Sequence, residues 1–193
     1  MKVAIIKYNA GNIRSVLFAL ERLGIMAEVT DDPDYIKSAD KVIFPGVGEA
    51  STTMEYLKNK GIDKLLRELK QPVLGICLGQ QLMCNRSEEG KTDCINIFNV
   101  PVLRFKPVMK VPHMGWNSLQ NMKGELFEGL GNNSYVYFVH SYYVPECEYS
   151  IAGSNYIVNF SAALRKDNFF STQFHPEKSG EVGQIILRNF IRL

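Results

Sequence analysis

The chain has 193 residues, of which 46% are hydrophobic and 22% are charged, and its 22 basic side chains nearly balance its 20 acidic ones. This ordinary composition excludes a disordered or collagen-like chain, and the lack of any block of like charges argues against a nucleic-acid-binding face. No apolar run approaches the roughly 20 residues of a membrane-spanning helix, and the run after Lys2 is too short for a signal peptide. We therefore expect a single domain over residues 1–193, located in the cytoplasm, that binds neither nucleic acid nor membrane.

The first part of the chain alternates short apolar runs with amphipathic segments. The apolar runs predict strands at residues 2–7, 26–30, 41–44 and 72–76. The spacing of apolar residues and the turn residues between them predict helices near residues 13–23, 33–39 and 50–69. Strands that are almost wholly apolar and alternate with helices indicate a parallel sheet covered on both faces.

Residues 94–174 follow a different pattern, in which many short β-like runs occur. Examples are residues 100–105, 135–139, 150–153 and 169–174. Antiparallel strands added to the open sheet would explain this pattern. A final helix follows, with Val182, Ile185, Ile186 and Phe190 on one face. We therefore predict an α/β fold, an open, mostly parallel, doubly wound sheet with added antiparallel strands.

Cys77 is the candidate nucleophile. It lies between Gly75 and Gly79, where an apolar strand runs into a helical pattern, and this G-x-C-x-G arrangement is the thiol counterpart of the nucleophile elbow. The sharp strand-to-helix turn requires small neighbours, and a position at a helix N-terminus favours the thiolate. The alternative is a buried cysteine beside a tight turn.

His175 and Glu177 are the candidate base and the carboxylate that orients it. Pro176 favours an extended conformation at His175, and alternate residues of an extended chain point the same way, so Glu177 would lie beside the imidazole. The alternative for the pair taken alone is two solvated polar residues at a strand end. Combined with Cys77, it supplies a nucleophile, a base and an orienting group.

The segment Pro45-Gly46-Val47-Gly48 follows a predicted strand and should reach the same sheet edge as Cys77. Its glycines would let the backbone N–H groups of Val47 and Gly48 approach a ligand. With the N–H of Leu78, the residue after the candidate nucleophile, they would form an oxyanion hole. The alternative is a plain Pro-Gly turn.

The remaining polar and aromatic residues have structural interpretations. His113 and His140 are typical of hydrogen-bonded structural histidines, and the aromatic residues between 135 and 143 are typical of core or interface. The other cysteines, Cys84, Cys94 and Cys147, are interpreted as free thiols packed as small hydrophobes. The sequence contains no CxxC pair, P-loop or GxGxxG pattern, so we expect no metal and no cofactor.

Three motifs in this order, PGVG, GICLGQQ and HPE, resemble the class I, triad-type glutamine amidotransferases, and the resemblance covers essentially the whole chain. Four further segments resemble one subfamily, the glutaminase subunits of imidazole glycerol phosphate synthases. They are KVPHMGWN at 110–117, FVHSYY at 138–143, YNAGNIRS at 8–15 and SEEG at 87–90.

The resemblance implies an activity and a partner. Glutamine would be hydrolysed to glutamate and ammonia by a Cys77–His175–Glu177 triad. The ammonia would pass to a separate (β/α)8-barrel cyclase subunit of histidine biosynthesis, with which the chain would form a heterodimer. In the resembled family the PGVG segment is non-productive until the partner engages, which implies a backbone switch at residues 46–48.

The resemblance also implies two sets of binding residues. The family's glutamine contacts correspond to Gly48, Gln81, Glu89, Ser141 and Tyr142. Its cyclase-facing residues correspond to Asn12, Trp116, Tyr135, Tyr137 and Lys178.

Other functions remain open from the sequence. One is a glutaminase that serves another synthase, such as a sugar amidotransferase, whereas the segment at 110–117 argues against anthranilate synthase. Another is a stand-alone cysteine hydrolase or peptidase on a related sheet. A regulatory binding module with an inactive site is the non-enzymatic alternative, and the complete set of triad residues argues against it.

Overall fold

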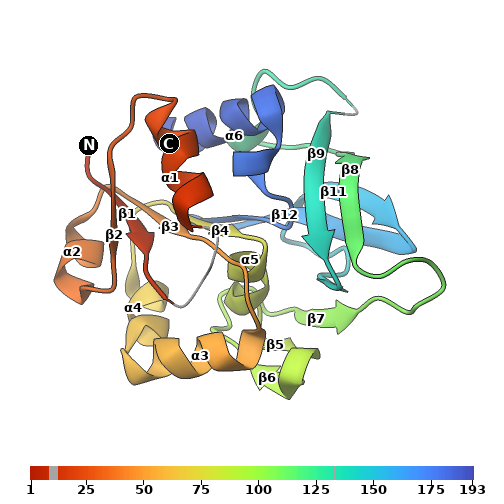
Figure 1. Ribbon diagram of the computed structural model, residues 1–193, viewed down its shortest axis with the longest axis horizontal. Helices are drawn as coiled ribbons and strands as arrows, with labels where there is room; N and C mark the ends of the chain where they lie inside the picture. Colours follow the sequence, from red (N-terminus) through yellow and green to blue (C-terminus); the bar gives the residue numbers. More distant parts are fainter. Residues whose placement is uncertain (9–12, 133) are drawn as a thin grey trace.

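A computed structural model describes residues 1–8, 13–132 and 134–193 (Figure 1). Among these residues, seven strands form the main sheet in the order β11-β12-β13-β4-β3-β1-β2. In chain order they are β1 (Val3–Ile6), β2 (Ala27–Thr30), β3 (Lys41–Phe44), β4 (Val73–Ile76), β11 (Ser150–Tyr156), β12 (Val158–Lys166) and β13 (Phe169–Thr172). The α-helices of the described residues are α1 (Ile13–Glu21), α2 (Pro33–Ser38), α3 (Ala50–Asn59), α4 (Ile62–Glu68), α5 (Leu78–Met83) and α6 (Gly180–Arg192).

The main sheet has a parallel part and an antiparallel part. Strands β2, β1, β3, β4 and β13 pair in parallel. Strands β12 and β11 continue the sheet beyond β13 in antiparallel pairing. The predicted fold class is therefore confirmed. So are the four strands predicted in the first part of the chain, each within two residues of its expected ends.

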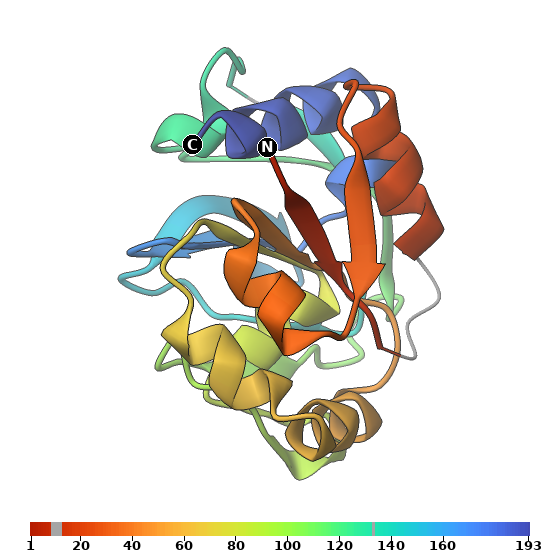
Figure 2. The same ribbon diagram turned by 90° about the vertical axis from the view of Figure 1, so that its left-hand side faces the viewer.

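Alternating side chains of the central strands divide the core into two layers. Val3 and Ile5 face α1 and α6, whereas Ala4 and Ile6 face α2, α3, α4 and α5. All four side chains are buried, as expected for strands covered on both faces. Figure 2 shows the two helical layers on opposite sides of the sheet.

Local sequence explains where two of the helices begin. Asp32 caps α2, because its side chain accepts from the backbone N–H of Asp34 at 2.9 Å, and Pro33 occupies the first helical position. The helical pattern predicted over residues 50–69 is confirmed as two helices, separated by a break that the pattern did not locate. Gly61 adopts a left-handed φ of 68°, which breaks the path between α3 and α4.

The region between α5 and β11 forms two small sheets. Strands β5 (Arg86–Ser87), β6 (Thr92–Asp93), β7 (Pro101–Arg104) and β10 (Tyr142–Tyr143) form one, and β8 (His113–Ser118) pairs with β9 (Tyr135–His140) in the other. The part of the chain that the structure describes also contains the 3-10 turns η1 (Glu89–Lys91), η2 (Glu125–Phe127) and η3 (Pro176–Lys178).

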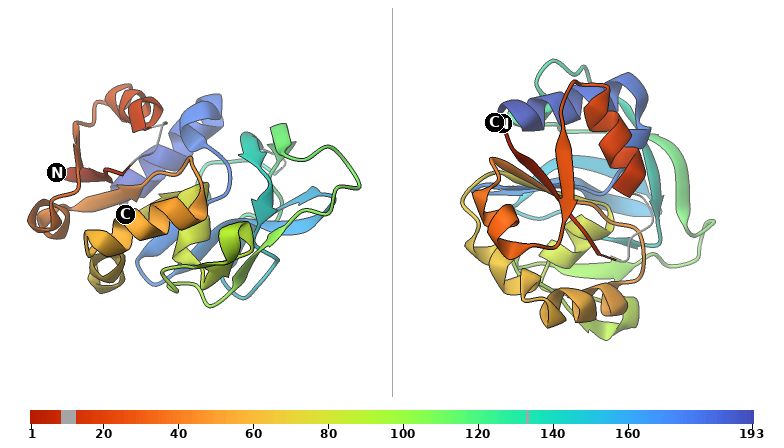
Figure 3. Two further views of the ribbon diagram at one scale, coloured as in Figure 1. Left: turned by 60° about the horizontal axis from the view of Figure 1, so that its bottom comes forward. Right: turned by 60° about the vertical axis from the view of Figure 1, so that its left-hand side comes forward.

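The expectation that the short strands are antiparallel additions to the open sheet is wrong for β13, which pairs in parallel with β4. It is also wrong for β7 and β9, which lie in the small sheets. These strands pair with other short segments instead, because period-two patterns do not specify a pairing partner. Figure 3 shows β8 and β9 at the antiparallel end of the main sheet, away from the β2 edge.

Candidate active site

Cys77 lies at the sharp turn between β4 and α5. Its backbone has a φ of 53°, an uncommon value for a residue with a side chain, and its N–H donates to the carbonyl of Thr172 at 2.7 Å. Gly79 permits the turn, since a Cβ there would lie 2.1 Å from the carbonyl oxygen of Phe44. The expected small neighbour is thus required by the close approach of α5 to β3.

His175 reaches Cys77 because β13 pairs with β4. Ile76 and Thr172 are register partners at the carboxyl ends of these strands, so the segments that follow them emerge at one edge. His175 Nδ1 lies 2.7 Å from Glu177 Oε1, and both side chains are almost completely buried. The predicted contact is present, and His175 is extended as expected. The expectation that the chain stays extended through Glu177 is wrong: Pro176 starts the turn η3, and this turn brings Glu177 back to the ring.

The charge balance around His175 favours its protonated form. Burial alone would lower the pKa of the imidazole. The negative charges of the Cys77 thiolate and of Glu177 outweigh burial and raise the pKa above its ordinary value. A hydrogen bond between the imidazole and the Cys77 side chain adds to this increase in the pKa, and because Nδ1 is bound to Glu177, Nε2 is the ring nitrogen that serves Cys77. The arrangement suits a thiolate–imidazolium pair that can exchange a proton with a bound substrate.

Besides His175, two of the described residues have hydrogen-bonding groups beside the sulfur of Cys77. The thiol is positioned to donate to the carbonyl of Val139 at 3.8 Å, and Gln173 Nε2 donates to the sulfur at 3.7 Å. Reasoning from the sequence did not single out Gln173. The sequence offered only its position two residues before His175, which by itself does not indicate a role in the site.

A cleft of about 310 Å³ opens beside Cys77, at the small end of the range for ligand pockets. It is lined by Gly46, Val47, Gly48, Cys77, Leu78, Gln81, Glu89, Pro112, Val139, His140, Ser141 and Tyr142. The residues expected to bind glutamine and to form the oxyanion hole therefore all line one cleft, together with the candidate nucleophile.

Two of these residues also hold the walls of the cleft together. Gln81 Nε2 donates to the Tyr142 carbonyl and to Gln173 Oε1, each at 3.0 Å. Glu89 accepts from the backbone N–H of Ala50, the first residue of α3, at 2.9 Å. Burial raises the pKa of Glu89, and the nearby charge of Glu49 adds to the increase, while the bond from Ala50 opposes it.

The Pro45–Gly48 segment is held in a conformation that does not direct all the expected donors into the cleft. The N–H of Leu78 points to the carbonyl oxygen of Gly46, 3.4 Å away. The Tyr8 hydroxyl donates to the Pro45 carbonyl and interacts with the N–H of Val47. Gly48 has a φ of 133°, which residues with side chains rarely adopt.

His113 and His140 form a buried hydrogen-bonded pair, in agreement with their structural interpretation. His140 Nδ1 lies 2.7 Å from the Tyr142 carbonyl, so this nitrogen carries the proton and Nε2 accepts from His113 Nδ1 at 2.9 Å. Burial lowers the pKa of His113 to about 4 and that of His140 to about 3. Both rings are therefore neutral near pH 7.

The residues expected at an interface lie on β8, β9 and the turn after Glu177. Trp116 and Tyr135 are 55% and 58% exposed, and Lys178 is also exposed. Tyr137 is half-buried and packs edge-on against Trp116, with ring centroids 6.1 Å apart. The aromatic side chains at 116 and 135 are thus not part of the chain's own core. Asn12 lies outside the described residues.

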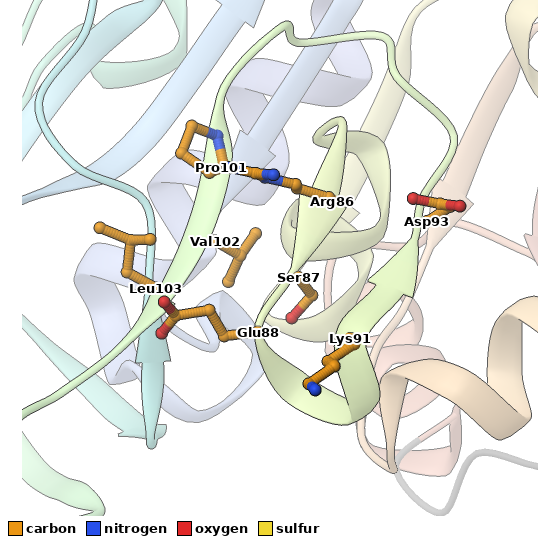
Figure 4. Close-up of a pocket in the computed structure, with 8 residues that line it drawn as sticks. All are labelled: Arg86, Ser87, Glu88, Lys91, Asp93, Pro101, Val102 and Leu103. Carbon is orange, nitrogen blue, oxygen red and sulfur yellow. The ribbon is translucent and has the colours of Figure 1, made fainter.

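Another hollow lies away from Cys77, between β5 and β7. Its volume is about 400 Å³, and Figure 4 shows Arg86, Glu88, Lys91 and Asp93 around it. These side chains are exposed and of mixed sign, and the candidate nucleophile and base are elsewhere. Within the described ranges, no cluster of three or more His, Cys, Asp or Glu residues is arranged to hold a metal ion. None of the described helices has the length and apolar character needed to cross a membrane.

Comparison with known proteins decides the family. The sequence model of the glutamine amidotransferase class-I family matches residues 5–193. The chain belongs to the class I glutamine amidotransferases. Within this family, it is 61% identical to the imidazole glycerol phosphate synthase subunit HisH of Bacteroides thetaiotaomicron, over the full length of both chains. It is 47% identical to the subunit of that name from Haemophilus influenzae strain KW20, covering 99% of this chain and 97% of the relative.

Solved structures of other proteins share the fold. One, described as a GMP synthase subunit from Thermoplasma acidophilum, has a TM-score of 0.74 and 22% identity over 100% of this chain and 92% of the other. Another is described as a glutamine amidotransferase, with a TM-score of 0.77 and 20% identity over 98% of this chain and 97% of the other. At these identities the likeness concerns the fold alone.

Proposed function

We propose that this amidotransferase is the glutaminase subunit of an imidazole glycerol phosphate synthase. It hydrolyses glutamine to glutamate and ammonia and passes the ammonia to a cyclase subunit in histidine biosynthesis. The observation that carries the activity is the cleft beside Cys77, into which the expected glutamine-binding residues converge. The observation that carries the pathway is the 61% identity to the Bacteroides HisH protein over the whole chain.

In the proposed mechanism, the Cys77 thiolate attacks the carbon of the substrate's side-chain amide. His175 gives a proton to the departing nitrogen, so ammonia leaves and a thioester remains. His175 then takes a proton from water, which attacks the thioester and releases glutamate and the thiolate. Glu177 accepts from Nδ1 of His175 and stabilises the imidazolium, a role supported by the 2.7 Å contact between buried groups.

The proposed substrate contacts follow from the chemistry of the cleft wall. Glu89 supplies a carboxylate suited to the α-ammonium group of glutamine. Backbone and side-chain groups of Gly48, Gln81, Ser141 and Tyr142 surround the rest of the substrate. The N–H groups of Val47, Gly48 and Leu78 are proposed to stabilise the oxyanion once the segment at 45–48 has rearranged.

The proposed partner is a (β/α)8-barrel cyclase that covers the cleft in a heterodimer. Ammonia that escaped into water at neutral pH would be protonated and lose its nucleophilicity, so direct transfer is part of the mechanism. Exposed Trp116, Tyr135 and Lys178, with half-buried Tyr137, support a docking surface here. Asn12 is proposed to join this surface on the strength of the sequence resemblance.

We also propose that residues 1–193 form one glutaminase domain and that it works in the cytoplasm. The single-domain proposal is supported by the main sheet, which joins β1 and β2 to strands as late in the chain as β13. The cytoplasmic proposal is supported by the four free cysteines, because a reducing compartment preserves the thiol that the mechanism requires.

Reconstitution tests the proposed function. The barrel cyclase from the same genome would be assayed for imidazole glycerol phosphate formation with either glutamine or an ammonium salt as the nitrogen source. We expect the cyclase alone to use ammonium at high pH and to use glutamine only when this chain is added. Glutamine hydrolysis that supports a sugar amidotransferase and never this cyclase would favour the paralogous function instead.

A further inference from the structure

Gln173 is a completely buried amide beside the candidate nucleophile. It lies on the short segment between β13 and His175, and its backbone N–H donates to the carbonyl of Ala162 at 2.8 Å. Its Nε2 donates to the sulfur of Cys77 at 3.7 Å. The backbone hydrogen bond to Ala162 ties the segment after β13 to the neighbouring strand β12. The main sheet therefore holds the side-chain amide of Gln173 beside the sulfur.

A second hydrogen bond fixes which end of the amide faces Cys77. Gln81 Nε2 donates to Gln173 Oε1 at 3.0 Å, and it also donates to the Tyr142 carbonyl at 3.0 Å. Because the backbone carbonyl of Tyr142 can only accept, the atom of Gln81 that faces it must be the nitrogen. The oxygen of Gln173 therefore faces Gln81, and its N–H faces the sulfur.

The two contacts of the sulfur favour opposite protonation states. The carbonyl of Val139 can accept a hydrogen bond from a thiol, at 3.8 Å, but repels a thiolate. The N–H of Gln173 is a weak partner for a thiol and a strong one for a thiolate, because hydrogen bonds to charged acceptors are about twice as strong as neutral ones. When Cys77 ionises, its hydrogen bond with Gln173 therefore becomes stronger and its interaction with the carbonyl of Val139 becomes unfavourable.

We propose that Gln173 is a further catalytic residue, which stabilises the Cys77 thiolate through its side-chain N–H. The inference rests on the proposed function and deepens it. When the thiol proton moves to His175 Nε2, the negative charge on sulfur gains the N–H of Gln173. Attack on glutamine consumes that charge as the S–C bond forms. Hydrolysis of the thioester breaks the S–C bond and returns the electron pair to sulfur, so Gln173 also assists departure of the thiolate.

Gln80 provides a matched control within the same core. It is a glutamine of equal burial on α5, and its side chain bonds to the Ser161 carbonyl at 3.3 Å and to the Ser171 hydroxyl at 3.0 Å. No described contact joins its side chain to Cys77. Replacement of either glutamine by Met removes a buried amide of similar size, but only Gln173→Met removes a donor to the sulfur.

The test compares wild type, Gln173→Met, Gln173→Glu and Gln80→Met in complex with the cyclase. Alkylation of Cys77 by iodoacetamide would be followed by peptide mapping near pH 7 and near pH 9.5, alongside glutamine turnover. For Gln173→Met we expect the rate of alkylation near pH 7 and the value of kcat/KM to fall roughly 10- to 100-fold, because this is the range for the loss of a hydrogen bond to a charged group. Near pH 9.5 the rate of alkylation should recover. Gln173→Glu should lose more, because it places a negative charge beside the thiolate.

The Gln80→Met variant should keep the wild-type alkylation profile in its folded fraction. Alkylation of Gln173→Met at the wild-type rate at both pH values, with turnover retained, would overturn the proposal while leaving the glutaminase function intact. If Gln173→Met does not fold, alkylation and turnover of the isosteric Gln173→Glu variant test the proposal instead. Absence of turnover in wild type, with normal Cys77 alkylation, would instead reject the proposed function.

Discussion

The backbone N–H of Leu78 points at the carbonyl oxygen of Gly46, 3.4 Å away, across the edge of the cleft that contains Cys77. A donor turned toward a protein carbonyl is not free to stabilise an oxyanion. Rotation of the Gly46–Val47 peptide would remove this carbonyl and turn the N–H of Val47 away from Tyr8. The glycines at 46 and 48 make such a rotation inexpensive.

We therefore predict that the isolated chain hydrolyses glutamine poorly and that the cyclase activates it. Loss of one oxyanion donor lowers kcat by about 10²- to 10³-fold, which sets the expected scale of activation. The measurement is glutamate production by the chain alone and with saturating cyclase and its bound ligand. Equal turnover in the two states would show that the resting conformation is already productive.

A second prediction concerns the carboxylate that orients His175. Glu177→Gln should preserve the fold but lower kcat on the order of 10³- to 10⁴-fold, because the amide does not stabilise the imidazolium or select its tautomer. Glutamine binding should change little, since Glu177 does not line the cleft. A Glu177→Gln variant with near wild-type kcat would reject the orienting role. The control is Glu181→Gln on the exposed start of α6, which also removes one negative charge.

A third prediction concerns the aromatic surface on β8 and β9. Trp116→Ala and Lys178→Ala should weaken binding to the cyclase or uncouple hydrolysis from ammonia use, while the free energy of unfolding changes little because both side chains are exposed. Met26, which is 82% exposed beside the opposite edge strand β2, is the matched control. Normal affinity and full coupling in both variants would mean that the cyclase docks elsewhere.

The buried histidine pair gives a prediction for stability at acidic pH. Burial lowers the pKa of His113 from 6.5 to about 4 and that of His140 from 6.5 to about 3. Between pH 6.5 and 4 the unfolded chain takes up protons that the folded chain does not, so the free energy of unfolding falls as the pH falls. Denaturant unfolding at several pH values should show a shallower dependence for His113→Gln than for wild type. Parallel curves for the two proteins would contradict neutral burial of His113.

The sequence predicted the main architecture because its strands are short, apolar and bounded by turn residues. The run at 41–44 is an example, since β3 occupies those residues. The break at Gly61 was missed because α3 and α4 both pack on the same core layer, so their apolar spacing continues across it. The separate small sheets were missed because β7 and β9 find partners far along the chain, which local alternation does not encode.

In the site, too, local sequence patterns identified individual residues but did not show which of them lie close together. Glycine spacing singled out Cys77, and the HPE motif singled out His175 and Glu177. Their proximity depends on the pairing of β4 with β13, which no local pattern reveals. Gln173 was missed because a glutamine is neither a nucleophile nor a general base, and its importance emerges only from its contact with the sulfur.

The most direct test of the central claim compares Cys77→Ala with Cys147→Ala, each in complex with the cyclase. Burial raises the pKa of Cys84, and it raises the pKa of Cys94 to about 12, so both thiols remain protonated. Cys147 is half-buried and is therefore the more accessible cysteine to use as a control. We predict that Cys77→Ala loses glutamine hydrolysis by about 10⁶-fold and still binds the cyclase, whereas folded Cys147→Ala keeps its kcat. Glutamine turnover that persists in a clean Cys77→Ala preparation, or that disappears in Cys147→Ala, would contradict the assignment of Cys77 as the nucleophile.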